Sequence, residues 1–187
     1  MIDGIKHLCG YGETLEHYDV VGNLIESYWG ADADIMFLEI GVNAGLMEHT
    51  LMARFPKMRF IAIDIVLPKF SPEELTRIRT IEKYSAEAWK DVERNSVDFV
   101  YVDGGHSYEE CYNDILNYMP LLKKKAIIAG HDYKFDWGVP AAVNKLFGEV
   151  NYGENLTWWV AKHDLVIQGS REKAIEWPKE TVSLRVN

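Results

Sequence analysis

Residues 35–45 read Ile-Met-Phe-Leu-Glu-Ile-Gly-Val-Asn-Ala-Gly, an apolar run that ends in a glycine-rich turn. A helical pattern follows, in which Leu46, His49, Thr50 and Ala53 share one face. A short apolar strand that leads through a tight turn into a helix is typical of βαβ units, which build parallel sheets. This stretch therefore predicts an α/β fold.

The same alternation recurs along the chain. Two capping patterns, Ser71-Pro72-Glu73-Glu74 and Ser107-Tyr108-Glu109-Glu110, predict helix starts, and the second helix runs to Met119. A further helix is expected over 139–147. The predicted strands are 35–40, 59–63, 80–84, 97–102 and 126–129, of which the half-polar 80–84 is more typical of an edge. Short apolar strands between helices indicate an open α/β sandwich with a parallel sheet covered on both faces.

The pattern changes after Phe147. Residues 156–161 and 164–167 are two apolar runs separated only by Lys162 and His163. This spacing predicts a hairpin at one edge of the sheet. Its Trp158-Trp159 pair is expected to be partly core and partly exposed rim, and offers a contact surface for a homo-oligomer.

Length and composition indicate one globular domain over residues 1–187. The chain has 187 residues, of which 48% are hydrophobic, and a formal charge of −9. On the prior of about 100–200 residues per domain there is room for one sizeable core. Apolar residues along the whole chain exclude a disordered protein, which would combine low hydrophobicity with high net charge.

Composition also bears on partners and compartment. No apolar run approaches the roughly 20 residues that cross a bilayer, so no membrane partner is expected. An acidic chain is repelled by phosphate backbones, which disfavours nucleic acid. The N-terminus lacks a secretory signal pattern, and Cys9 and Cys111 match no metal spacing. Reduced thiols in a cytoplasmic protein are the expectation.

Ionisable residues gather where strands end. In an open parallel sheet, ligands bind outside the carboxyl ends of the strands, near the point where strand order reverses. The successive predicted strand ends carry Glu39 with the glycine loop, Asp64, Tyr84-Ser85, Asp103 with His106, and His131-Asp132. This edge of the sheet is therefore the predicted site.

The glycine loop after the first strand suits a nucleoside. No Gly-x-Gly-x-x-Gly passes through residues 39–45, and the Walker Lys-Ser/Thr is absent. Asp64, at the end of the second strand, can accept both hydroxyls of a ribose. The combination points to a nucleoside cofactor without a diphosphate. The alternative is a tight turn beside a solvated loop aspartate.

Two segments now carry a resemblance to a known family. Residues 100–109 read Val-Tyr-Val-Asp-Gly-Gly-His-Ser-Tyr-Glu, and 127–133 read Ile-Ile-Ala-Gly-His-Asp-Tyr. With the glycine loop and Asp64, they resemble class I S-adenosylmethionine-dependent methyltransferases, and more narrowly the metal-dependent O-methyltransferases that modify sugars on macrolides. The resemblance runs from about Ile35 to Phe147. It implies a Rossmann-like three-layer sandwich, with a mostly parallel seven-stranded sheet and a C-terminal antiparallel hairpin.

The resemblance also implies where S-adenosylmethionine binds. The glycine loop would pass beneath its methionine part, Asp64 would hold the ribose hydroxyls, and the residues after the third strand would contact the adenine edge. The implied cofactor residues are Glu39, Gly41, Val42, Asn43, Gly45, Asp64, Ser85, Ala86 and Asp103.

A divalent metal is implied at Asp103, His131 and Asp132. The pair after the fifth strand is acidic in both places in the sugar-modifying relatives and Asp-Asn in the catechol-modifying ones, so His131-Asp132 departs from both. Magnesium prefers oxygen ligands, whereas imidazole suits manganese, iron or zinc. Magnesium is expected first on the resemblance, with manganese close behind. His131 can instead hydrogen-bond the Asp103 loop without touching a metal.

His106 stands where the sugar-modifying enzymes place their general base. A sugar hydroxyl is a poor acid, and an imidazole accepts its proton near neutral pH. Asp103 is the second expected catalytic residue, through the metal. The alternative for His106 is a helix-capping or core histidine. Glu109, Glu110 and Asp114 are explained by the helix dipole and solvation without a function.

The sequence thus predicts methyl transfer to a hydroxyl of a sugar or small polyol, with metal assistance. One alternative is a phenol or catechol O-methyltransferase, and another is a non-catalytic cofactor-binding module. Little chain remains outside the core, so we expect a shallow acceptor site, or one completed by another subunit. The aromatic stretch 133–138 is expected to cover the acceptor, and Gly10-Tyr11-Gly12-Glu13 to fold over the cofactor.

Overall fold

A seven-stranded sheet lies at the centre of the computed structural model, which describes residues 16–134 and 137–162. The strand order is β3-β2-β1-β4-β5-β7-β6. Strands β1 to β5 are parallel, and β7 runs antiparallel to both β5 and β6. The strands are β1 (Met36–Ile40), β2 (Arg59–Asp64), β3 (Ile78–Glu82), β4 (Val97–Val102), β5 (Leu122–Gly130), β6 (Asn151–Tyr152) and β7 (Trp158–Ala161). The predicted mostly parallel sheet with an antiparallel pair is confirmed.

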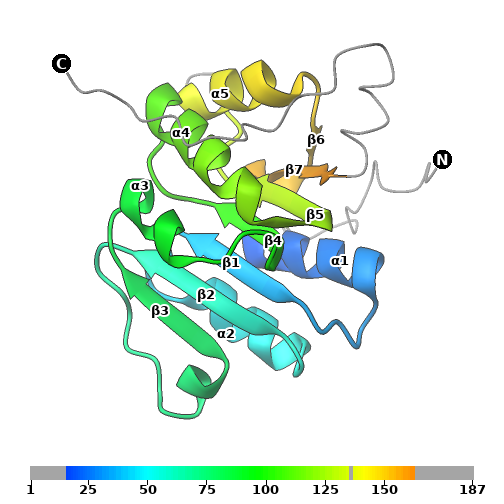
Figure 1. Ribbon diagram of the computed structural model, residues 1–187. Coiled ribbons are helices and arrows are strands. Elements are labelled where there is room, and N and C mark those ends of the chain that lie inside the picture. The colour runs from blue at the N-terminus through cyan, green and yellow to red at the C-terminus, as the bar shows by residue number, and fades with distance from the viewer. Residues whose placement is uncertain (1–15, 135–136, 163–187) are drawn as a thin grey trace.

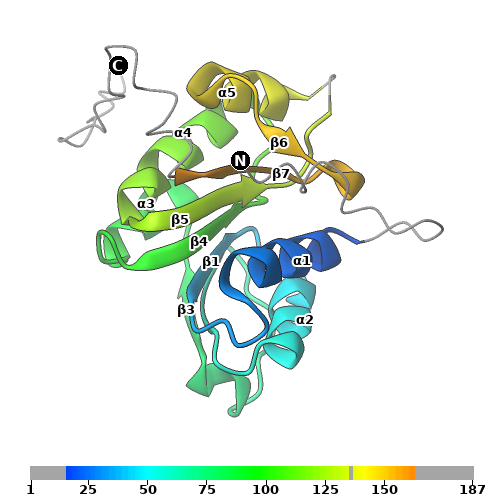
Figure 2. The same ribbon diagram turned by 90° about the vertical axis from the view of Figure 1, so that its right-hand side faces the viewer.

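Helices cover both faces of this sheet (Figures 1 and 2). Helices α1 and α2 pack on one face, and α3, α4 and α5 pack on the other. The α-helices are α1 (His17–Trp29), α2 (Leu46–Arg54), α3 (Ser85–Ala88), α4 (Tyr108–Tyr118) and α5 (Gly138–Phe147). Short 3-10 helices are η2 (Glu74–Thr76), η3 (Trp89–Asp91), η4 (Met119–Leu121) and η5 (Glu154–Leu156). The predicted three-layer sandwich is confirmed.

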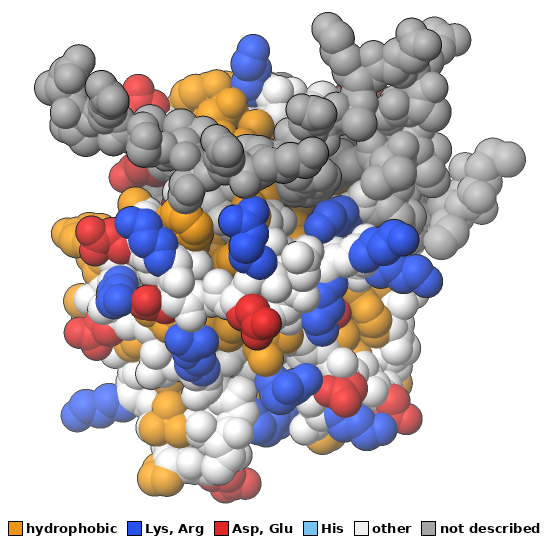
Figure 3. Space-filling model, in the orientation of Figure 1, with side chains coloured by type: hydrophobic (Ala, Val, Ile, Leu, Met, Phe, Trp, Pro, Cys, Tyr) orange, Lys and Arg blue, Asp and Glu red, His pale blue; other side chains and the backbone are white. Residues whose placement is uncertain are grey.

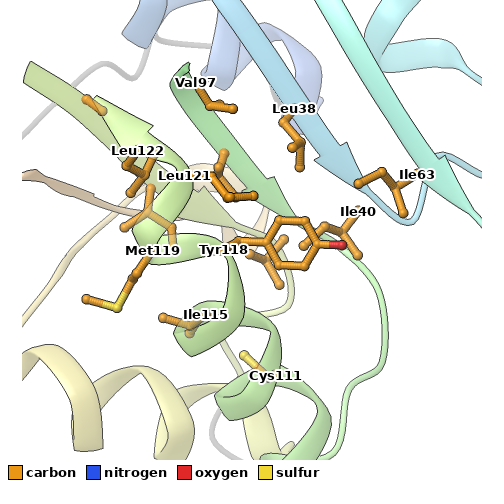
Figure 4. Packing of buried hydrophobic residues seen from close by; sticks show 14 of the residues in the cluster. Leu38, Ile40, Ile63, Val97, Cys111, Ile115, Tyr118, Met119, Leu121 and Leu122 are labelled. Atoms are coloured by element: carbon orange, nitrogen blue, oxygen red, sulfur yellow. The ribbon is translucent and has the colours of Figure 1, made fainter. Parts of the chain in front are cut away.

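Alternating side chains of the strands supply two cores. Phe37, Phe60 and Phe99 from β1, β2 and β4 meet on the face covered by α1 and α2. Their neighbours in sequence, such as Leu38, point to the opposite face, where Figure 4 shows Tyr118 and other α4 side chains packed against the strands. Burial on both faces explains why these strands read as continuous apolar runs.

Strand order reverses at β1: β2 and β3 lie on one side of it, and β4 and the later strands lie on the other. The register brings Ile40 beside both Ile63 and Val102, and Val102 beside Gly130. The carboxyl ends of four neighbouring strands are therefore level, and the residues that follow them meet at one edge of the sheet.

The predicted helix at Ser71 is only a short turn. Its cap forms, because the Ser71 backbone N–H donates to Glu74 Oε2 at 2.6 Å and the Glu74 N–H donates to Ser71 Oγ at 3.3 Å. The helix nevertheless ends at Thr76, and β3 begins two residues before the predicted Thr80. All three residues of this turn lie outside the buried core, so no apolar face holds a longer helix against the sheet.

Two further differences concern helices. In α2, the predicted shared face begins with Leu46 and His49, and both side chains are exposed. The side chains that α2 buries include Met47 and Leu51, on another face of the helix. Helix α1 was not predicted, although it contributes Val21 and other side chains to the core.

The C-terminal pair differs in detail from the predicted hairpin. Strand β7 lies within predicted run 156–161, but its outer neighbour is β6, which precedes it, and run 164–167 lies outside the described residues. Because β7 lies between β5 and β6, Trp158 is 0% and Trp159 5% exposed. The expected exposed rim at these tryptophans is therefore wrong. The contact surface for a homo-oligomer at this hairpin stays a prediction, because its second run lies outside the described residues.

The surface carries both signs of charge, as the face drawn in Figure 3 shows. Within residues 16–134 and 137–162, no helix is both long and apolar enough to cross a bilayer. Cys111 is a free, buried thiol, and burial raises its pKa to about 12, whereas Cys9 lies outside the described residues.

Arg77 ties the end of α2 to the start of β3, which gives a test of the fold. Its Nε donates to the carbonyl of Met58 at 2.9 Å, its Nη1 to that of Met52 at 3.3 Å and its Nη2 to that of Phe55 at 2.6 Å. We expect Arg77→Met to lower the free energy of unfolding by about 2–4 kcal/mol in urea, because three carbonyls lose a charged donor.

Arg79→Met is the matched control, because Arg79 donates one hydrogen bond, from Nη2 to the carbonyl of Asp91. Its expected cost is below about 1 kcal/mol. Equal losses for the two variants would contradict this role of Arg77.

Candidate functional site

A cavity of about 530 Å³ opens at the carboxyl ends of β1 to β4. Six of the nine predicted cofactor residues line it: Gly41, Asn43, Asp64, Ser85, Ala86 and Asp103. Glu39, Val42 and Gly45 do not line it. Tyr84, which was expected at this edge of the sheet, also lines it, whereas Ile65, Lys83, Asn113 and Asp114 are lining residues that the sequence reasoning missed.

The loop after β1 needs glycine because another backbone passes close by. Gly41 has φ +87°, and a Cβ built there would lie 2.0 Å from the carbonyl oxygen of Asp103. No side chain fits at that distance, and the left-handed conformation itself disfavours one. The loop and the end of β4 are thus in direct contact.

Asp64 is held by the same loop. The backbone N–H of Asn43, a left-handed residue with φ 49°, donates to Asp64 Oδ2 at 3.0 Å, and that of Val66 donates to Oδ1 at 3.2 Å. Each carboxylate oxygen retains a lone pair for a further donor. The carboxylate therefore faces the cavity in a fixed position and can accept hydroxyl groups there.

Glu39 points away from the cavity and forms a buried pair with Glu48 of α2. Their exposed fractions are 2% and 0%. Burial raises the pKa of both carboxyls, and the neighbouring Glu48 raises that of Glu39 further. Two neighbouring carboxyls in an apolar setting disfavour the state in which both are ionised, so the pair favours sharing one proton.

Asp114 reaches the cavity from α4. It is only 3% exposed, which contradicts the expectation that solvation explains it. Burial raises the pKa of Asp114 to about 6, although a hydrogen bond with the Ser85 side chain acts to lower it. Tyr118 Oη donates to the Ser85 carbonyl at 3.0 Å, which ties α3 to α4 behind the cavity. Glu110 instead completes the predicted capping box with Ser107.

Asp103, His131 and Asp132 come together where β4 and β5 end. His131 Nδ1 lies 3.6 Å from Asp103 Oδ1 and 3.2 Å from Asp132 Oδ1, and one ligand atom from each residue lies within 4.8 Å of the others. Asp132 has φ 59°, a strained conformation of the kind that persists at functional sites. Burial raises the pKa of Asp103 to about 6, although the nearby His131 acts to lower it.

His106 lies beside this trio and does not cap a helix. Its Nε2 is 2.8 Å from Asp132 Oδ2, and its side chain is 53% exposed. Ser107 provides the cap of α4 instead. The predicted base and the predicted metal ligands therefore form one cluster, joined through the two oxygens of Asp132.

Two aromatic side chains adjoin the cluster: His17, which the sequence did not point to, and Trp137, which belongs to the stretch expected to cover the acceptor. His17 of α1 lies 4.9 Å, ring to ring, from His131, and both burial and His131 lower its pKa. Trp137 stacks on His106. Residues 135–136 of the predicted aromatic cover lie outside the described residues, as do residues 10–13. Only tertiary structure brings His17 here, so no local pattern could have found it.

The chain is similar in sequence to a known family and to two uncharacterized proteins. Residues 38–133, slightly more than half of the chain, match a family model described as a methyltransferase domain. An uncharacterized protein of Acanthamoeba polyphaga mimivirus is 24% identical in an alignment of 163 positions that covers 77% of this chain and 73% of that protein. An uncharacterized protein of Sinorhizobium fredii is 37% identical over 54 residues, 29% of this chain and 6% of that protein.

Solved structures share the fold at low identity. A Corynebacterium glutamicum protein has TM-score 0.57 and 14% identity, over 77% of this chain and 81% of that one. The Burkholderia thailandensis 1,6-didemethyltoxoflavin-N1-methyltransferase, solved with S-adenosylhomocysteine, has a TM-score of 0.53 and 13% identity. The match covers 77% of this chain and 76% of that one. The Geobacter metallireducens precorrin-6y C5,15-methyltransferase has a TM-score of 0.52 and 17% identity, and the match covers 81% of this chain and 92% of that one. These likenesses support the fold, and the named methyltransferases act on different acceptors.

The buried Glu39–Glu48 pair gives a prediction about pH. A carboxyl whose pKa is higher in the folded than in the unfolded state stabilises the fold at acid pH, and that contribution is lost as pH rises through the raised pKa. We expect the free energy of unfolding to fall as pH rises above the ordinary range of a carboxyl pKa, and Glu48→Gln to flatten this fall.

The measurement is urea unfolding of both proteins across that pH range. Glu82→Gln, at an exposed position of β3, is the control and should keep the wild-type slope. A wild-type slope in Glu48→Gln would show that the pair does not share a proton.

Proposed function

The chain belongs to the methyltransferase domain family, and from this premise we propose that it transfers a methyl group from S-adenosylmethionine to a hydroxyl oxygen. The proposed acceptor is a sugar or small polyol. One observation carries the proposal: Asp103 both lines the cavity and belongs to the cluster with His106, His131 and Asp132. A methyl donor in the cavity would thus adjoin groups that bind and deprotonate a hydroxyl.

The cavity suits S-adenosylmethionine in size and chemistry. Its volume of about 530 Å³ falls within the range of small-molecule sites. Asp64 would accept the ribose hydroxyls, and Ser85 and Ala86 would adjoin the adenine. The Gly41 backbone can approach the methionine part closely because it carries no side chain. Carboxylates at the cavity wall suit a cofactor with a positive sulfur.

Asp103, His131 and Asp132 would hold a divalent cation. One ligand atom from each of the three residues lies within 4.8 Å of the others, so together they could bind one ion. Magnesium is proposed first because of the resemblance to the metal-dependent O-methyltransferases, with manganese close behind because the imidazole of His131 favours it. A bound divalent cation supplies Lewis acidity that makes an acceptor hydroxyl easier to deprotonate.

His106 would take the acceptor's proton. The acceptor oxygen forms a bond to the methyl carbon as the carbon–sulfur bond breaks, and the electron pair of that bond stays on sulfur, leaving neutral S-adenosylhomocysteine. The hydroxyl proton passes to the imidazole. Asp132 can stabilise the resulting imidazolium, because its Oδ2 lies 2.8 Å from Nε2. Alignment of oxygen, methyl and sulfur supplies much of the remaining acceleration.

Removal of the imidazole tests this role. We expect His106→Ala to lower kcat for methyl transfer by about 10²- to 10⁴-fold, because the general base is lost, and to leave S-adenosylhomocysteine binding within twofold. The assay follows labelled methyl from S-adenosylmethionine to simple glycosides, inositol and catechol. His49→Ala removes an exposed histidine of α2 and is the matched control.

Undiminished transfer by His106→Ala would rule out a general base at this position. Faster turnover of catechol than of any glycoside or polyol would favour the phenolic alternative, since a phenol needs less help to lose its proton. Binding of S-adenosylhomocysteine without turnover of any hydroxyl would favour a non-catalytic module.

The metal site gives a prediction independent of turnover. We expect Mn²⁺, followed by its electron paramagnetic resonance signal, to bind the wild type and to bind Asp103→Asn and Asp132→Asn at least about tenfold more weakly. Asp34→Asn, at an exposed position away from the cluster, should bind as the wild type does. Equal binding by all variants would place the metal elsewhere.

A further inference from the structure

We propose that Trp137 is a positioning residue that holds the His106 imidazole in one orientation beside Asp132. The proposal rests on the proposed role of His106 as the general base. Trp137 would then act on the reaction through His106, and not by contact with the acceptor, as the expected aromatic cover would.

The two rings are stacked. Their centres are 5.0 Å apart and their planes differ by 15°. Offset parallel stacking at this distance is a favourable arrangement for aromatic side chains. Since half of the His106 side chain is exposed, the rest of the pocket leaves the imidazole room to rotate. The indole removes much of that freedom.

The stack complements the contact with Asp132. The 2.8 Å contact between Nε2 and Asp132 Oδ2 fixes where one ring nitrogen lies, and the stack fixes the plane of the ring. With a hydrogen on Nε2 donated to Asp132, Nδ1 carries the free lone pair. Among the described residues, none bonds to Nδ1. The two contacts together therefore determine where the basic nitrogen points.

The backbone next to Trp137 lies in close contact with the start of α4. Gly138 begins α5, and a Cβ added there would lie 2.1 Å from the backbone nitrogen of Tyr108. Only glycine allows the start of α5 to touch the start of α4. His106 lies just before the start of α4, and Trp137 lies just before the start of α5. The close approach of the two backbones therefore brings the two rings together.

Lys134 occupies more of the indole. Its Nζ lies 4.8 Å from the centre of the Trp137 ring, a cation–π distance, and its carbonyl accepts the backbone N–H of Trp137 at 3.4 Å. The indole is therefore engaged by an imidazole and an ammonium group at once. This arrangement favours a fixed support for His106 over a surface on which an acceptor ring would stack.

The expected cost of losing the support is moderate. Misplacement of a catalytic group by about 1 Å can lower a rate by about 100-fold. We expect Trp137→Leu to lower kcat by about 10- to 100-fold and to leave the KM of the acceptor and the affinity for S-adenosylhomocysteine within twofold. Trp137→Phe keeps an aromatic face and should restore most of kcat.

A double variant separates support from an independent role. If Trp137 acts only through His106, then Trp137→Leu has no further effect on kcat in the His106→Ala background. Trp29→Leu, a change of another partly buried tryptophan far along α1, is the control for general loss of packing. Additive losses in the double variant, or a raised KM with unchanged kcat, would overturn the proposal.

Nuclear magnetic resonance of the His106 ring gives a readout that does not depend on turnover. The ring protons of His106 should show an upfield ring-current shift in the wild type that is lost in Trp137→Leu and largely kept in Trp137→Phe. Unshifted protons in the wild type would overturn the proposal. If the shift behaves as expected but His106→Ala retains full activity, the proposed base fails while the contact stands.

Discussion

The contact between the Gly41 backbone and the Asp103 carbonyl is the constraint on which this molecule depends. Strand β1 lies between β2 and β4, so the turn after β1 must pass directly against the end of β4. The space that a side chain at Gly41 would fill is occupied by backbone. This closeness makes Asp103 a wall of the cavity as well as a member of the cluster with His131 and Asp132.

Sequence reasoning predicted the parallel sheet and the elements around the site. It succeeded where local pattern and buried strand coincide, as at β4, whose bounds match the prediction. The cluster of Asp103, His106, His131 and Asp132 was also predicted as a group, because parallel strands place their carboxyl ends at one edge. Local chemistry and topology agreed at these positions.

The features that escaped prediction depend on contacts between distant residues. Asp114 looks like an ordinary acid near a helix start, and only the packing of α4 buries it at the cavity. The cap at Ser71 forms, yet no core lies beneath it to extend a helix. Trp158 and Trp159 looked like an edge because β6, two residues long, has too little pattern to be recognised before them.

The pairing of β1 with β4 also affects how the chain folds. Phe37 pairs with Phe99, and these positions are 62 residues apart (99 minus 37). Contacts of such separation form slowly, because a long loop must be closed before any gain in stability. During synthesis β1 and β2 emerge before β4, and until β4 follows, one edge of β1 has unpaired backbone N–H and C=O groups. The site forms only after β4 and β5 have emerged, because Asp103 follows β4 and His131 follows β5, and until then the incomplete sheet is open to aggregation.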